Sequence, residues 1–323
     1  MTKKRERTED QGSALIGVAG DSASGKATFA HGIQQILGVE NVTAISLDDY
    51  HSMDRRERQQ KGITPLDPRA NKMRLMAEHA RLLKEGKTIV KPVYNHNNGT
   101  FGQPEEVVPK RVVVMTGLLP YMEEEMREIF DFKVFLDPHE ELKWKWKLDR
   151  DTTTRGYTAH QLNAEAQARK RDFERFVKPQ KSYADMIVRF YPAASIISPQ
   201  MLIHALVIKK QRNGNGTAQN LAWICHEITS IEVHNDMDPL VLGIHEQVEG
   251  HGIKMIEEQI INGTQLLGQP HEPDIWTMGG EKTGLQICLL LLSWQILTML
   301  GDCDKAALGE VKRDFPKEHQ AIA

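Results

Sequence analysis

The feature that most constrains this chain is a glycine-bracketed turn between an apolar run and a helical stretch. Residues 14–20 read ALIGVAG, residues 20–26 read GDSASGK, and a helical pattern follows over 26–37. In this context the spacing Gly20-x-x-x-x-Gly25-Lys26 predicts a loop whose backbone N–H groups surround a phosphate chain at the start of a helix. A strand–turn–helix with unrelated glycines is the alternative, and the combination of motif and context favours the phosphate loop.

The loop departs from the usual motif directly after its lysine. That position normally holds a Ser or Thr whose hydroxyl is a ligand of Mg²⁺, but here it holds Ala27. Thr28 comes one place later, about 100° further round the helix, so it cannot simply take the same position, although a phosphate oxygen stays within its reach. We expect nine residues to bind a nucleotide's phosphates: Gly20, Asp21, Ser22, Ala23, Ser24, Gly25, Lys26, Ala27 and Thr28.

Short apolar runs alternate with helical stretches through the first 190 residues, which is typical of an α/β fold. The runs are continuous rather than alternating, as in strands buried on both faces of a parallel sheet. Strands are predicted at 14–20, 42–47, 88–94, 111–115, 132–136 and 186–190. Helices are predicted at 26–37, 69–85, 121–129, 139–151 and 159–176. We therefore expect a mostly parallel central sheet with helices on both faces.

The pattern changes beyond residue 200. Residues 202–211 and 227–235 alternate like half-exposed strands, a pattern typical of antiparallel sheets, and a turn signal lies between them at 211–217. Two helical stretches follow, near 245–262 and 283–300. We divide the chain into a tail (1–13), a core (14–200) and an extension of the same sheet (201–323). A small second lobe, or one continuous domain over 14–323, stays open.

Charge and composition exclude several classes of protein. Residues 1–190 carry 32 Lys and Arg against 28 Asp and Glu, whereas the remainder carries 9 against 16, so an anionic ligand is expected in the first part. The pI of about 6.5 argues against a nucleic-acid partner, and three cysteines are too few and too scattered for a disulfide framework or zinc site.

The charged start does not resemble a signal peptide. The 16-residue apolar run at 285–300 is short for a membrane span. We expect a cytoplasmic protein with no membrane partner, in which this run forms a buried helix or a dimer contact.

Several longer segments resemble one family in order over residues 14–191. They read ISLDDYHSMDRRER (45–58), GITPLDPRAN (62–71), KPVYNHNNGTF (91–101), DFKVFLDP (131–138), WKLDRDTTTRGY (146–157) and ARKRDFERFVKPQKSYAD (168–185). Together they are similar to the phosphoribulokinases, in the uridine kinase branch of P-loop kinases. The phosphate loop lacks cysteine and no long insert is present, so the chain resembles the archaeal form more than the redox-regulated plant form.

The resemblance implies a P-loop kinase fold and a reaction. The γ-phosphoryl group of ATP, with Mg²⁺, would pass to the 1-hydroxyl of ribulose 5-phosphate, and the enzyme would be a homodimer. By resemblance Asp48 is the general base and Lys26 contacts the transferring phosphates. Asp49 is a second candidate near the substrate, or orients metal-bound water. An isolated Asp-Asp pair would more often be a polar loop, and the residues around it favour the functional interpretation.

The resemblance also assigns the substrate side and a lid. Arg55 would bind the sugar phosphate, and Tyr94 and His96 would line the sugar site. Lys147, Arg150 and Asp151 are spaced to share one helix face, with Arg155 just beyond it. Without the family match this stretch would more simply be a solvated basic helix. As a lid, it would place the cations Lys147, Arg150 and Arg155 over the transferring group, with Asp151 in a catalytic role.

Four positions depart from the family pattern, and no metal ligand is assigned. Ala23 replaces a loop glycine, Ala27 replaces the metal hydroxyl, Thr116 stands where the family has a glutamate, and Leu119 replaces a histidine. Asp137 is a substitute carboxylate by position only. Two alternatives therefore stay open: a nucleotide- or sugar-phosphate-binding homologue with impaired catalysis, and a uridine kinase-like enzyme for another hydroxyl substrate.

Overall fold

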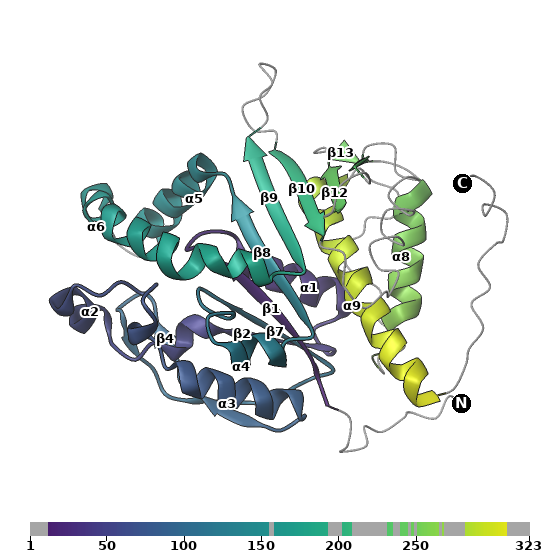
Figure 1. Cartoon of the computed structure of the whole chain (residues 1–323), viewed down its shortest axis with the longest axis horizontal. Coiled ribbons are helices and arrows are strands. Elements are labelled where there is room, and N and C mark those ends of the chain that lie inside the picture. Colours follow the sequence, from purple (N-terminus) through teal and green to yellow (C-terminus); the bar gives the residue numbers. More distant parts are fainter. Residues whose placement is uncertain are drawn as a thin grey trace.

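A single sheet runs through the molecule and carries helices on both sides (Figure 1). The computed structural model describes residues 12–154, 158–192, 202–208, 231–234, 240–244, 247–248, 251–264, 267 and 282–308. Within these residues the sheet has eight strands in the order β11-β12-β10-β9-β8-β1-β7-β2.

Five neighbouring strands of the sheet are parallel. Every residue of β1 and of β7 is buried, which explains why these strands read as unbroken apolar runs. The predicted strands are thereby confirmed as β1 (Ala14–Gly20), β2 (Val42–Ser46), β7 (Val112–Gly117), β8 (Phe132–Pro138) and β9 (Met186–Pro192). The mostly parallel α/β fold is confirmed with them.

The C-terminal strands continue the same sheet in the antiparallel sense. The predictions at 202–211 and 227–235 correspond to β10 (Leu202–Ile208) and β11 (Ile231–His234). The strand between them in the sheet, β12 (Leu240–Ile244), was not predicted. The turn expected at 211–217 lies outside the described residues, and the proposed domain boundaries stay a prediction.

Alternate residues of the strands face two separate apolar cores. One core contains Ile16 and Val18 of β1 and packs against α1 (Lys26–Leu37), α8 (His251–Thr264) and α9 (Gly284–Leu308). The other contains Leu15 and Ala19 and packs against α3 (Met73–Lys84) and α4 (Glu124–Ile129). Helices therefore cover both faces of the sheet, as expected.

Several predicted boundaries were wrong. The strand predicted at 88–94 is not in the central sheet, because Val90 of β3 (Ile89–Lys91) is 59% exposed and the strand pairs only with β6 (Glu105–Val107). The helix predicted from 245 begins at His251, since β13 (Gln247–Val248) first pairs with β14 (Lys282–Thr283). The helix predicted at 159–176 is α6 (Ala159–Asp172) followed by a π-helical turn, Phe173–Val177.

Three further helices lie in the first half of the chain. The helix expected over 69–85 starts only at Met73, after a 3₁₀ turn at Pro68–Ala70, and the helix expected at 139–151 is α5 (Glu140–Thr153). The helix α2 (Arg55–Lys61) was missed. It starts at Asp54, whose side chain accepts from the Glu57 N–H while the Glu57 side chain accepts from the Asp54 N–H, a reciprocal cap that stabilises a short helix.

The apolar helix α9 lies inside the fold. Its residues from Ile287 to Leu292 are at most 5% exposed, and they pack in the core shared with α1 and α8. A Cβ at Gly32 of α1 would lie 2.4 Å from Leu289 Cδ1, so the two helices touch closely. Core packing therefore accounts for the apolar sequence, and none of the described helices has the length and hydropathy needed to cross a bilayer.

The burial of α9 predicts a large effect of truncating Leu289. We expect Leu289→Ala to lower the free energy of unfolding by about 2–5 kcal/mol, because it leaves a cavity between α1 and α9. Val39→Ala is the matched control: Val39 is 53% exposed, and its truncation should cost within about 0.5 kcal/mol. Urea unfolding of both variants measures the difference. Equal stabilities would contradict the core assignment of α9.

Candidate functional site

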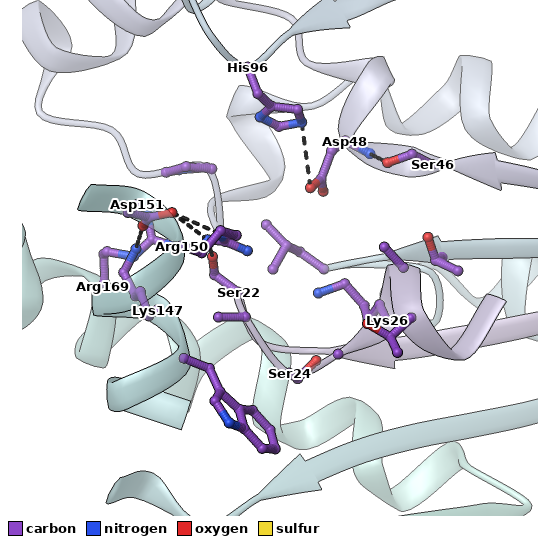
Figure 2. Close-up of a pocket in the computed structure, with 18 of the residues that line it drawn as sticks. Ser22, Ser24, Lys26, Ser46, Asp48, His96, Lys147, Arg150, Asp151 and Arg169 are labelled. Carbon is purple, nitrogen blue, oxygen red and sulfur yellow. Dashed lines mark hydrogen bonds and ion pairs between the residues drawn. The ribbon is translucent and has the colours of Figure 1, made fainter. Parts of the chain in front are cut away.

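A cavity of about 800 Å³ lies at the carboxyl edge of the parallel strands. The ends of β1, β2 and β7 reach it through the phosphate loop, Ser46 and Thr116, and α5, α6, β9 and α9 close it from the other side. Open α/β sheets place their ligands at this edge. Figure 2 shows Ser22, Ser24 and Lys26 of the loop, with Asp48 and His96 above them and Lys147 and Arg150 at the left, near Ser22.

The phosphate loop (residues 20–28) is built by two backbone constraints. Gly25 adopts φ 90°, a left-handed conformation that favours glycine, directly before α1. A Cβ at Gly20 would lie 2.5 Å from Ser24 Oγ and 2.8 Å from the carbonyl oxygen of Leu136, so only glycine fits there. Ala23 also adopts a left-handed φ of 63°, although it is not glycine. The sequence motif thus corresponds to a tight turn that opens the helix.

Lys26 and Ser24 carry polar groups directed into the loop. Lys26 Nζ donates to the carbonyl oxygens of Gly20 at 2.9 Å and Asp21 at 2.7 Å. Burial lowers the pKa of Lys26, and the nearby charges of Asp48 and Asp21 only partly oppose this. Ser24 Oγ is fully buried and has no hydrogen-bond partner within the described residues. An anion in the loop would relieve both groups, so the loop fits a phosphate.

Asp48 follows β2 and faces the cavity. It lies in the 3₁₀ turn Leu47–Tyr50, whose start is fixed because the Asp48 N–H donates to Ser46 Oγ at 3.3 Å. Its Oδ2 is 4.0 Å from Nε2 of His96, and 28% of its side chain is exposed. The carboxylate is thus oriented and open to a ligand, as a general base must be.

Asp49 is placed differently from its neighbour. Its carboxylate accepts from Lys91 Nζ at 2.7 Å and from the Tyr94 N–H at 2.9 Å, and the residue does not line the cavity. Lys91 in turn lies 3.0 Å from Glu105 on the paired strand β6. The geometry therefore makes Asp49 a support for the hairpin that carries Tyr94 and His96, rather than a group that contacts a ligand.

Arg55, Tyr94 and His96 all line the cavity, as predicted from the sequence. Arg55 Nη2 donates to the carbonyl oxygen of His96, and Tyr94 OH donates to the carbonyl oxygen of Gly99 at 3.0 Å. Arg58 was missed, although it lies three residues after Arg55 on the same face of α2. Its guanidinium is buried, and Nη2 donates to Tyr94 OH at 2.9 Å.

His51 was also missed, and it is buried in this wall of the cavity. It is 2% exposed, its Nδ1 is 2.9 Å from Oδ1 of Asn71, and its ring packs edge-on against Tyr94. Burial lowers the pKa of His51 to about 4, although the charge of Asp48 acts in the opposite direction. The residue is therefore neutral at neutral pH and offers hydrogen bonds rather than charge.

The predicted lid residues form one ion-pair cluster. Asp151 is 1% exposed and accepts from Lys147 Nζ at 2.5 Å and from Arg150 Nε at 2.8 Å. Burial alone would raise the pKa of Asp151, but these hydrogen bonds outweigh it and lower the pKa. The pKa of Lys147 is lowered by burial and by the charge of Arg169. Arg169 also lines the cavity and was not predicted from the sequence. Arg155 lies outside the described residues.

The helix α5, which the family resemblance assigns as a lid, is joined to the phosphate loop by two contacts. Arg150 Nη2 donates to Ser22 Oγ at 3.0 Å, and Lys143 Nζ lies 3.0 Å from Asp21 Oδ2. The Lys143–Asp21 pair is largely shielded from water, since its side chains are 12% and 16% exposed, and the Arg150–Ser22 pair is partly buried. Arg150 and Lys143 of α5 are thus held directly beside the phosphate loop.

The departures from the family pattern have structural consequences. Thr116 lines the cavity, whereas Leu119 is buried in the core. Asp137 does not line the cavity, because its carboxylate pairs with Lys181 and Arg189. Within the described residues no three His, Cys, Asp or Glu side chains are grouped as a metal site. The donors present, Asp48 with the hydroxyls of Ser46 and Thr116, fit a Mg²⁺ ion that keeps most of its water and phosphate ligands.

The chain is similar to known kinases in sequence. The model of the phosphoribulokinase / uridine kinase family matches residues 15–197. A phosphoribulokinase of Synechocystis sp. is 46% identical over 198 residues, which cover 61% of this chain and 60% of that protein. A uridine kinase of Shewanella amazonensis is 32% identical over 182 residues, or 54% of this chain and 86% of that protein.

Two further comparisons concern chloroplast relatives and the fold. The chloroplastic phosphoribulokinase of Arabidopsis thaliana is 38% identical, over 58% of this chain and 51% of that protein. The chain thus spans about half to 60% of the length of these curated phosphoribulokinases. The solved structure of phosphoribulokinase from Rhodobacter spheroides matches with a TM-score of 0.56 at 16% identity, over 89% of this chain and 100% of that one, which supports the fold alone. The grouping with the archaeal form stays a prediction.

The low pKa of His51 predicts how stability depends on pH. Between pH 6.5 and about 4 the unfolded chain binds a proton at His51 and the folded chain does not, so the free energy of unfolding falls as the pH falls. The contribution of His51 is about 3 kcal/mol, and it levels off below pH 4. His51→Gln removes the titration, so the wild-type advantage over this variant should shrink by that amount between pH 7 and 4 in urea unfolding. A constant difference over this range would contradict the assignment.

Proposed function

Because the chain belongs to the phosphoribulokinase and uridine kinase family, we propose that it transfers the γ-phosphoryl group of ATP to the 1-hydroxyl of ribulose 5-phosphate. One observation carries the proposal. The described residues that line the cavity include six cationic side chains and only two carboxylates, on both sides of the phosphate loop. Such a cavity suits two phosphorylated ligands that meet at the loop.

The proposed steps use this chain's own residues. Asp48 accepts the proton of the substrate hydroxyl, the freed oxygen attacks the γ-phosphorus, and the bond to the β–γ bridging oxygen breaks so that ADP leaves. Lys26, Lys147 and Arg150 stabilise the charge on the transferring group. Asp151 contacts Lys147 and Arg150 and positions them. Mg²⁺, where it accompanies ATP, neutralises phosphate charge, with Asp48, Ser46 and Thr116 as the available protein donors.

The substrate side favours a sugar phosphate over a nucleoside. Arg55 donates to the carbonyl oxygen of His96 and Arg58 donates to Tyr94 OH, and both arginines line the cavity on the same side of the phosphate loop as Asp48. A nucleoside has no phosphate for these guanidiniums to bind, whereas ribulose 5-phosphate carries one at the end opposite its 1-hydroxyl. The uridine kinase-like alternative rests on the similarity to uridine kinases and is tested by the choice of substrate. A homodimer and a cytoplasmic location are proposals that rest on the family resemblance alone.

The direct test is ADP release from the purified protein. With ATP, Mg²⁺ and ribulose 5-phosphate we expect turnover of about 1–100 s⁻¹. Asp48→Asn should lower kcat by about 10²–10⁴-fold, because it removes the base, while ATP binding is retained. Asp137→Asn is the matched control, since Asp137 pairs with Lys181 away from the cavity, and its kcat should stay close to that of wild type.

Two outcomes would count against the proposed reaction, and a third would count against the placement of Asp137 away from the cavity. ADP release with uridine but not with ribulose 5-phosphate would favour the nucleoside kinase. No release with either substrate, while ATP still binds, would indicate a binding homologue with impaired catalysis, as the departures at Ala27 and Thr116 allow. A large loss in Asp137→Asn would show that the metal-side carboxylate comes from Asp137 after all.

A further inference from the structure

The cavity extends to both sides of the phosphate loop along the edge of the sheet. The strand order β9-β8-β1-β7-β2 places the loop, which follows β1, at the centre. Asp48 follows β2, two strands away on one side, and Phe190 lies in β9, two strands away on the other. Strands in a sheet are about 4.8 Å apart, so each side extends roughly 10 Å from the loop.

The two sides differ in chemistry. The β2 side carries His51, Arg55, Arg58, Tyr94 and His96, which together suit a polar, anionic ligand. The β9 side carries the cations Lys147 and Arg150 of α5 and Arg169 of α6, and it also has an apolar part formed by Trp146 of α5, Phe190 of β9 and Leu285 of α9. Trp146 and Phe190 meet edge-on, with ring centroids 5.9 Å apart and an interplanar angle of 70°. Trp146 is half-buried against the core and cannot turn freely away from the cavity.

The apolar part of the β9 side fits a flat aromatic group, whereas the cations of α5 and α6 on the same side suit phosphates. The indole of Trp146 and the side chains of Phe190 and Leu285 offer apolar surface, and base stacking on aromatic side chains is favourable. When the β-phosphate occupies the loop, the β2 side is needed by the phosphoryl acceptor, because Asp48 lies there. The remainder of the nucleotide must then extend toward β9.

We propose that Trp146, Phe190 and Leu285 form the subsite for the nucleotide base, with Trp146 as its main contact. The inference deepens the proposed function and rests on it. It also gives the C-terminal helix α9 a role in binding, because Leu285 lies beyond residues 15–197, the part matched by the family model. The base site thus joins the lid helix, the core sheet and the C-terminal extension.

The test compares ATP with inorganic tripolyphosphate, which has the phosphates but no base. Trp146→Ala in the full chain should weaken ATP binding about tenfold or more in calorimetric titration, and leave tripolyphosphate binding unchanged. Trp144→Ala is the matched control: Trp144 is two residues away on α5, 36% exposed, and does not line the cavity. It should bind both ligands as wild type does.

A second readout does not depend on affinity. ATP should quench tryptophan fluorescence in wild type and in Trp144→Phe, and the quench should be largely lost in Trp146→Phe, which keeps an aromatic ring and therefore the fold. Leu285→Ala should weaken ATP but not tripolyphosphate, by less than Trp146→Ala does. Tripolyphosphate should not quench, because it does not reach Trp146.

The outcomes separate this inference from the proposed function. Unchanged ATP affinity in Trp146→Ala, or equal losses for ATP and tripolyphosphate, would overturn the base subsite even if phosphoryl transfer to ribulose 5-phosphate is measured. Failure of wild type to bind either ligand would overturn the proposed function together with the subsite. Selective loss of ATP binding without any turnover would support the subsite and refute the kinase activity.

Discussion

The site depends on one close approach, that of the Gly20 backbone to Ser24 and to the carbonyl oxygen of Leu136 on β8. Because no side chain fits at Gly20, the chain can turn sharply from β1 into α1 while β1 stays paired with β7 and β8. This places the N-terminus of α1 at the centre of the parallel strands. The carboxyl ends of the other strands then lie on both sides of it, so residues far apart in sequence reach one cavity.

The charges of the cavity are balanced only in part before a ligand binds. Asp151 is buried and satisfies Lys147 and Arg150, which carry the charge of the lid, and Asp48 partly offsets the burial of Lys26. The pKa values of Lys26 and Lys147 are lowered, which means that burial disfavours the charged form of both ammonium groups. A negatively charged phosphate oxygen beside them would stabilise the charged form again. Carboxylates of the protein therefore hold these cations in place, and an anionic ligand would neutralise the positive charge that remains.

The sequence predicted the parts of the structure that follow from local pattern. Buried parallel strands read as apolar runs, and the loop motif located the turn before α1 at Lys26. The predictions failed where strand pairing between distant segments determines the structure. Val90 is apolar, yet it is exposed in the two-stranded sheet β3–β6. Leu240–Ile244 forms a strand through its pairing with β10 and β11. Arg58 could have been found from its helical spacing to Arg55. The roles of Asp48 and Asp49 could not be separated from sequence, because a distant partner, Lys91, decides between them.

The departures at Ala27 and Thr116 both lie on the metal side, and neither changes the cations. A glutamate at position 116 would add a third carboxylate to a cavity that has two, whereas threonine leaves the six described cations of the wall in larger excess. In the proposed reaction, Lys26, Lys147 and Arg150 would neutralise more of the phosphate charge, and less would depend on metal ligands from the protein. A Mg²⁺ ion that keeps its waters and binds mainly through phosphates needs few protein donors. The substitutions are thus consistent with a kinase whose side-chain cations carry more of the electrostatic stabilisation.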